Sequence, residues 1–146
     1  MPGSDLPLAR LIVAYGAAAV VLAALDGVWL STVGRAFFRP SLEPLLADRL
    51  NWAPAIVFYV LYVGGVVIFA IGPALKGGGW AQAALMGALF GFFCYATYDL
   101  TNMATLKLWP LKVALLDVAW GALVTGAAAA AGAGAAAGAG AAQRAF

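Results

Sequence analysis

Four long apolar runs, separated by short polar connections, occupy most of this chain. The runs cover about residues 8–30, 52–71, 81–100 and 111–133. Each is close to the roughly 20 residues that a helix needs to cross a hydrocarbon core of about 30 Å. The chain is 65% hydrophobic and only 10% charged, which is too little charge for a soluble domain. We therefore predict one integral membrane domain over residues 1–146, an all-α bundle of four transmembrane helices.

The remaining composition excludes several kinds of site. The net charge of +2 comes from scattered residues without a basic run, so nucleic acid is not expected as a partner. The chain has no histidine, so we predict no metal and no haem or other cofactor of the usual kind. The single cysteine, Cys94, cannot form an internal disulfide, and its mid-span position predicts a buried, inert thiol rather than a reactive one.

A cleaved signal peptide is an alternative interpretation of the first run, because residues 17–19 are alanines that could suit a signal peptidase. However, the short polar lead, residues 1–7, is barely basic, and apolar residues continue well past that point. We therefore predict an uncleaved first span.

The longest connection, residues 31–51, has the pattern of an amphipathic helix lying flat at the lipid headgroups between spans 1 and 2. Four leucines would fall on one side of it: Leu42, Leu45, Leu46 and Leu50. Ser41 could cap its start. The alternative is a folded loop over the bundle.

Small residues are concentrated in the last two runs. Gly87 and Gly91 have the GxxxG spacing that lets helices approach closely, and would offer a face for a homodimer. Residues 126–142 are almost wholly alanine and glycine, which contribute little to membrane insertion or to helicity. We expect the first half of this tail to be helical and its end to fray.

Three aspartates, Asp26, Asp99 and Asp117, interrupt the apolar runs. Four spans place both termini on one side and both long connections on the other. At about 1.5 Å per residue, all three acids then lie within roughly 10 Å of the connection face. A carboxylate at a helix centre costs about 2.5–3.5 kcal/mol on insertion scales, so three of them indicate a shared site or a set of structural pairs.

We predict a ligand-binding pocket at this face, made of the acids and the polar and aromatic residues near them. Its members are Asp26, Trp29, Tyr98, Asp99, Asn102, Asp117 and Trp120. Aspartates beside indole rings can hold an ammonium group, and clustered acids suit proton transfer or acid catalysis. The alternative is structural: each acid pairs with an arginine, a lysine or an indole N–H and fixes the helix register.

Positive charge is more frequent on the connection side. This side carries Arg35, Arg39, Arg49, Lys107 and Lys112, whereas Arg10, Lys76 and Arg144 lie opposite. The positive-inside rule therefore predicts that connections 31–51 and 101–110 are cytoplasmic.

Several strings resemble a known family. Residues 98–106 (YDLTNMATL), Trp109-Pro110 and residues 117–121 (DVAWG), together with Leu25-Asp26, are similar to the bacterial membrane-protein family catalogued as domain of unknown function 2177. The resemblance covers about residues 8–125, and the Ala/Gly tail departs from it. It implies a four-span protein of the bacterial inner membrane, in a family without an established activity.

Three functions remain open, and the sequence does not decide whether the protein is an enzyme. The first is binding of a membrane lipid or small amphiphile, for example in lipid modification, with the acids holding a polar head and the aromatic residues a tail. The second is a proton- or cation-coupled carrier that uses the same acids and would require a dimer. The third is a structural subunit with a larger membrane-protein partner.

Overall fold

The computed structural model describes residues 7–145, which are helical almost throughout. Four helices are long and apolar enough to cross a membrane, which confirms the predicted helical membrane bundle. Residues 1–6 of the polar lead, and Phe146, lie outside the described residues.

The first span belongs to a helix that is longer than predicted. The α-helix α1 (Leu8–Trp29) continues into the π-helical segment η1 (Leu30–Phe38), then α2 (Arg39–Leu42) and the 3-10 turn η2 (Glu43–Leu45). These four elements form one helical stretch, Leu8–Leu45.

The prediction of a separate interfacial helix from Ser41 onward is therefore wrong. The Ser41 hydroxyl donates to the Phe37 carbonyl oxygen at 2.8 Å, so Ser41 lies within a helix and does not cap a new one. Residues 46–51 contain no helix. The leucine spacing fitted a new helix, but no proline lies between residues 8 and 39, so the helical backbone of the first span continues.

The second span combines α3 (Trp52–Val66), the π-helical segment η3 (Val67–Ile71) and α4 (Gly72–Ala74). Each π-helical segment of the chain ends two residues before a proline, at Pro40 for η1 and Pro73 for η3. Proline lacks an N–H group and clashes with the carbonyl four residues earlier in an α-helix. The wider π turns change the hydrogen-bond register, and the helices continue through both prolines.

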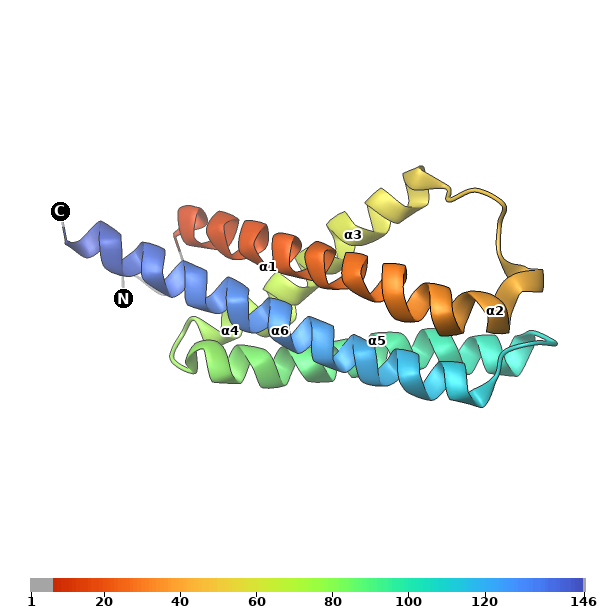
Figure 1. Cartoon of the computed structure of the whole chain (residues 1–146). Coiled ribbons are helices and arrows are strands. Elements are labelled where there is room, and N and C mark those ends of the chain that lie inside the picture. The colour runs from red at the N-terminus through yellow and green to blue at the C-terminus, as the bar shows by residue number, and fades with distance from the viewer. Residues whose placement is uncertain (1–6, 146) are drawn as a thin grey trace.

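The third and fourth spans are the helices α5 (Gly79–Thr105) and α6 (Leu111–Arg144). The start of α1, the turn from α4 to α5 and the end of α6 lie at one end of the bundle, and the connections before α3 and before α6 lie at the other (Figure 1). We call this second end the connection end. The predicted up-and-down topology is confirmed. The α4–α5 turn depends on glycine at Gly77 (φ 151°) and Gly79 (φ 67°).

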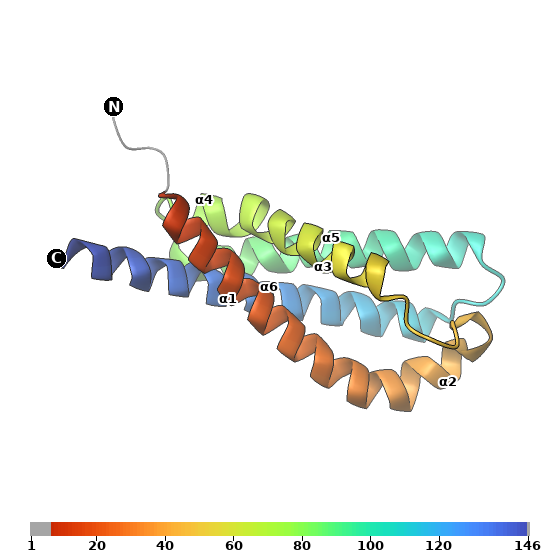
Figure 2. The same ribbon diagram turned by 90° about the horizontal axis from the view of Figure 1, so that it is seen from above.

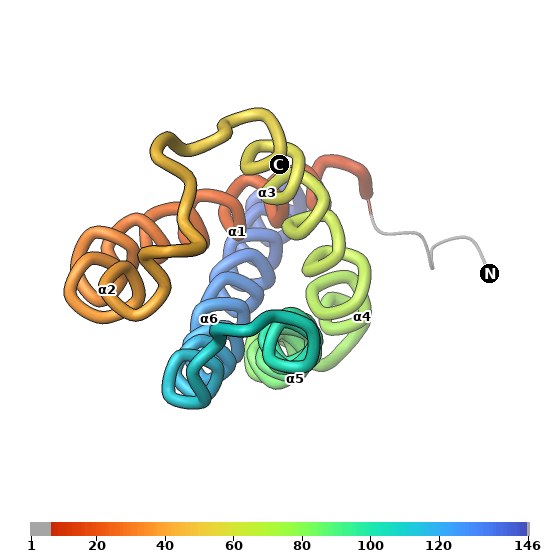
Figure 3. Tube along the Cα trace, turned by 90° about the vertical axis from the view of Figure 1, so that its right-hand side faces the viewer, coloured from red at the N-terminus to blue at the C-terminus, as the bar shows by residue number. Residues whose placement is uncertain are grey.

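The helix α6, with its Ala/Gly tail, is central to the bundle. It packs along α5 and against α1, and the end-on view places it among the other helices (Figure 3). The helix α1 crosses it obliquely (Figure 2). The expected fraying of the tail is wrong, because the helix continues to Arg144. Buried small residues explain this: Gly126, Ala128, Ala129, Gly132, Ala133, Ala136 and Gly140 are covered by neighbouring helices, and this packing compensates for weak helix propensity.

The GxxxG pair of α5 packs against α6 of the same chain. A Cβ atom at Gly87 would lie 2.6 Å from the Ala129 Cβ, and one at Gly91 would overlap the Gly121 carbonyl oxygen. The dimer face expected at these glycines is therefore wrong, since they are already occupied within the chain.

We predict that Gly91→Leu lowers the free energy of unfolding by about 3 kcal/mol, because the new side chain forces α5 away from α6. The measurement is the SDS-induced unfolding midpoint of the purified protein in mixed micelles. The matched control is Gly134→Leu in α6, where a Cβ would meet nothing within 4 Å and the change should stay within about 0.5 kcal/mol. Equal losses in the two variants would contradict this packing.

Candidate functional site

Asp26, near the connection end of α1, joins three helices. Its Oδ2 accepts a hydrogen bond from the Tyr59 hydroxyl of α3 at 2.7 Å. Its Oδ1 accepts one from the Trp120 indole N–H of α6 at 3.0 Å. The residue is 7% exposed, so these donors offset the loss of water around the carboxylate.

A tryptophan stack lies beside this carboxylate. The rings of Trp29 and Trp120 are stacked with centroids 4.4 Å apart and an interplanar angle of 4°. Each tryptophan follows an aspartate by three residues in the sequence, which places it on the same helix face as that acid. The Asp-x-x-Trp pattern thus brings the α1 and α6 faces together.

Asp99, on α5, is 0% exposed. Its Oδ1 accepts a hydrogen bond from the Trp109 indole N–H at 3.1 Å. Trp109 belongs to the connection between α5 and α6, so this bond holds the connection against α5. The other oxygen, Oδ2, is buried and receives no hydrogen bond from the described residues.

Asp117, on α6, lies close to the Asp99 carboxyl group, although no hydrogen bond joins the two groups in the structure. Ionised carboxylates only accept hydrogen bonds, so a bond between these two groups requires one proton. Asp117 is half-buried, and within residues 7–145 no N–H or hydroxyl group donates to it. Of the three aspartates, Asp117 is therefore the one without a hydrogen-bond donor from a tyrosine or tryptophan of the described residues.

Across the described part of the chain, no arginine or lysine pairs with any of the three acids. The Lys112 ammonium group instead lies over the Phe37 ring, 5.1 Å from its centroid. The structural interpretation therefore holds for Asp26 and Asp99 through indole N–H groups. It does not account for Asp117.

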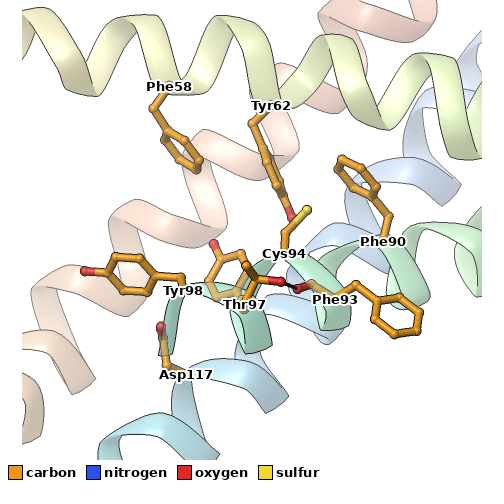
Figure 4. Close-up of a pocket in the computed structure, with 9 residues that line it drawn as sticks. Phe58, Tyr62, Phe90, Phe93, Cys94, Thr97, Tyr98 and Asp117 are labelled. Atoms are coloured by element: carbon orange, nitrogen blue, oxygen red, sulfur yellow. Dashed lines mark hydrogen bonds between the residues drawn. The ribbon is translucent and has the colours of Figure 1, made fainter. Parts of the chain in front are cut away.

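Two neighbouring cavities share Asp117, Phe58, Tyr95 and Tyr98 in their linings. The larger, of about 750 Å³, lies between α3 and α5, with Phe58 and Tyr62 pointing down from α3 (Figure 4). Its other lining residues are Phe90, Phe93, Cys94 and Thr97. The smaller cavity, of about 270 Å³, is also lined by Asp26, Trp29, Leu30, Phe38, Leu42, Tyr59, Trp109 and Trp120.

The structure brings the three acids together from α1, α5 and α6, as the topology predicted. Five of the predicted site residues line the smaller cavity: Asp26, Trp29, Tyr98, Asp117 and Trp120. Asp99 lies behind this lining, bonded to Trp109, and Asn102 lines neither cavity. Whether these residues bind a ligand stays a prediction.

Sequence reasoning missed residues that complete the site. Tyr59 and Trp109 supply the donors to Asp26 and Asp99, and Tyr95 lies between the two cavities. A signal was present, since a hydroxyl or indole N–H within an apolar run needs an acceptor. Cys94 is half-buried and lines the larger cavity, so the predicted buried position is corrected.

A comparison with protein families finds one match. The family described as "Predicted membrane protein (DUF2177)" matches residues 11–134. The match extends past residue 125, so it includes part of the Ala/Gly tail that was expected to depart from the family. No curated protein and no solved structure matches the chain.

We predict that Asp26→Asn lowers the free energy of unfolding by about 1–2 kcal/mol, because the amide nitrogen would face a donor and one hydrogen bond would be lost. SDS unfolding of the purified variant measures this. Asp117→Asn is the matched control, and its amide can donate to Asp99, so we expect a change within about 0.5 kcal/mol. Equal destabilisation by both substitutions would mean that all the acids are structural.

Proposed function

This chain belongs to the DUF2177 family of predicted membrane proteins, and we propose that it binds a membrane amphiphile with its polar head at Asp117. The observation that carries the proposal is the position of Asp117. It has no N–H or hydroxyl donor among the described residues, and it lines both the larger and the smaller cavity. A ligand bound there would have a head beside a carboxyl group and a tail in the larger cavity.

The head that suits this position is an ammonium group. A carboxylate attracts it by charge, and the aromatic rings of Tyr95 and Tyr98, which line the same cavity, suit a cation–π contact in a region with little water. An anionic head would be repelled by Asp117 and by the neighbouring Asp99 and Asp26.

The tail that suits the larger cavity is an alkyl chain. Aromatic side chains form most of the lining, and a volume of about 750 Å³ is within the usual range of small-molecule sites, about 300–1,000 Å³. Phe93 (64% exposed) and Phe58 (45% exposed) stand at the bundle surface, which faces lipid in a membrane. This supports entry of the tail sideways from the bilayer.

Cys94 gives a direct test, since it lines the larger cavity and is the sole cysteine of the sequence. We expect dodecylammonium to slow the alkylation of Cys94 by N-ethylmaleimide. About tenfold more dodecyl sulfate should be needed for the same protection, because its head is anionic. Asp117→Asn should remove this preference.

The control for this experiment is Leu89→Cys in a Cys94→Ala background. Leu89 lies on the same helix, is 43% exposed and lines neither cavity, so its alkylation should not respond to the head group. Equal protection of Cys94 by the two amphiphiles would remove the proposed role of Asp117.

A proton-coupled carrier is the second candidate, and the Asp99–Asp117 pair favours it. The two acids lie close together, so a shared proton would relieve their repulsion, and the buried Asp99 Oδ2 has no hydrogen-bond partner among the described residues. If the protein carries protons, a pH gradient across protein-containing liposomes should decay faster than across empty ones, and Asp99→Asn should abolish the difference. Asp26→Asn, outside the pair, should retain the flux, and no flux in the unsubstituted protein would eliminate this candidate.

We also propose that the protein lies in a bacterial inner membrane with its connection end in the cytoplasm. The excess of arginine and lysine at this end supports the orientation. In a Cys94→Ala background, Lys107→Cys should resist a membrane-impermeant maleimide added outside cells and react after the membrane is opened. Labelling in intact cells would reverse the assignment.

A further inference from the structure

We propose that a separate basic cavity at the connection end binds the phosphate group of a membrane phospholipid. This cavity of about 640 Å³ is formed by η1, α2 and the segment that leads to α3. Arg35, Arg39 and Arg49 line it together with one acid, Asp48, so its lining has a formal charge of +2. All three arginines are exposed and so are free to reorient around a ligand.

The height of the cavity matches the phosphate layer of a bilayer. The first helical stretch begins at Leu8, and about 20 residues at about 1.5 Å each cross the hydrocarbon core. Arg35 and Arg39 come after that point and are still in the helix. They are therefore placed beside lipid headgroups.

The chemistry of the lining favours a lipid over a free anion. Four leucines line the same cavity as the arginines: Leu30, Leu42, Leu46 and Leu50. An arginine side chain can hold two phosphate oxygens at once, and leucines can cover the glycerol and upper acyl carbons of the same molecule. Free inorganic phosphate would leave these leucines uncovered.

This site is distinct from the one at Asp117. Leu30, Phe38 and Leu42 line both the basic cavity and the smaller acidic one, so the two are neighbours, but Asp117 does not line the basic cavity. Repulsion from Asp26 and Asp117 would keep a phosphate on the arginine side. The proposal therefore does not depend on the amphiphile that we assign to Asp117.

Native mass spectrometry of the full chain in detergent, titrated with phosphatidylglycerol, tests the proposal. We expect each of Arg35→Gln, Arg39→Gln and Arg49→Gln to weaken binding about fivefold, and the triple variant roughly 100-fold. Lys107→Gln is the matched control, because this cation is at the same end but outside the cavity, and its affinity should be unchanged. Unchanged affinity in the triple variant would overturn the proposal.

The variant Gly34→Leu tests whether phosphatidylglycerol binding requires the space of the cavity or only the positive charge of the arginines. A Cβ at Gly34 would make an ordinary contact, 3.5 Å from the Trp29 carbonyl oxygen, so the helix can accept it while the side chain fills the cavity. We expect a loss of phosphatidylglycerol binding with all arginines present. Full binding by Gly34→Leu would overturn the cavity assignment.

Inorganic phosphate serves as the competitor in the same titration. It should not displace phosphatidylglycerol at equal concentration, and displacement would overturn the lipid assignment. Protection of Cys94 by dodecylammonium should persist in the triple variant, so failure of the phosphate site can be distinguished from failure of the Asp117 site. The unfolding midpoint in SDS confirms that each variant is folded.

Discussion

A carboxylate buried in a membrane bundle must find its hydrogen-bond donors within the protein, because lipid tails offer none. Asp26 finds them on two other helices, at Tyr59 and Trp120. Asp99 finds one in the connection that follows its own helix, at Trp109. These bonds fix α1, α3 and α6 relative to one another and hold the α5–α6 connection. The site at the connection end depends on them.

The opposite end of the bundle is held by close packing of small residues. Gly132 lies against Ile71 and the Ala14 backbone, and a Cβ there would meet both at under 3 Å. Arg10 is accommodated in the same way: its Nε donates to the Ala136 carbonyl oxygen at 3.2 Å, in the space left by Gly140. Towards its first residue α3 diverges from α5 (Figure 1), and the larger cavity occupies the space between their side chains.

The sequence predicted the features that depend only on chain order and hydropathy. Four apolar runs fix an up-and-down topology, and that topology alone brings Asp26, Asp99 and Asp117 to one end. The spacing of Gly87 and Gly91 indicated a close helix contact but did not identify the other helix. In the structure, these glycines pack against α6. Helix propensity alone underestimated how far the Ala/Gly tail is helical, because its helix is stabilised by burial against neighbouring helices, which is a tertiary effect. The larger cavity could not be predicted, since it depends on how far α3 leans from α5.

The Ala/Gly composition of the α6 tail favours close helix packing but disfavours insertion into the membrane. Leucine would make this segment partition into a bilayer more readily, yet it would keep α1 and α5 at a distance. Alanine and glycine contribute little to membrane insertion, but they allow the helix backbones to approach closely. Such a segment is stable in a membrane only when other helices pack against it. Its place in the bilayer therefore depends on its contacts with α1 and α5, which bury the small residues of the tail.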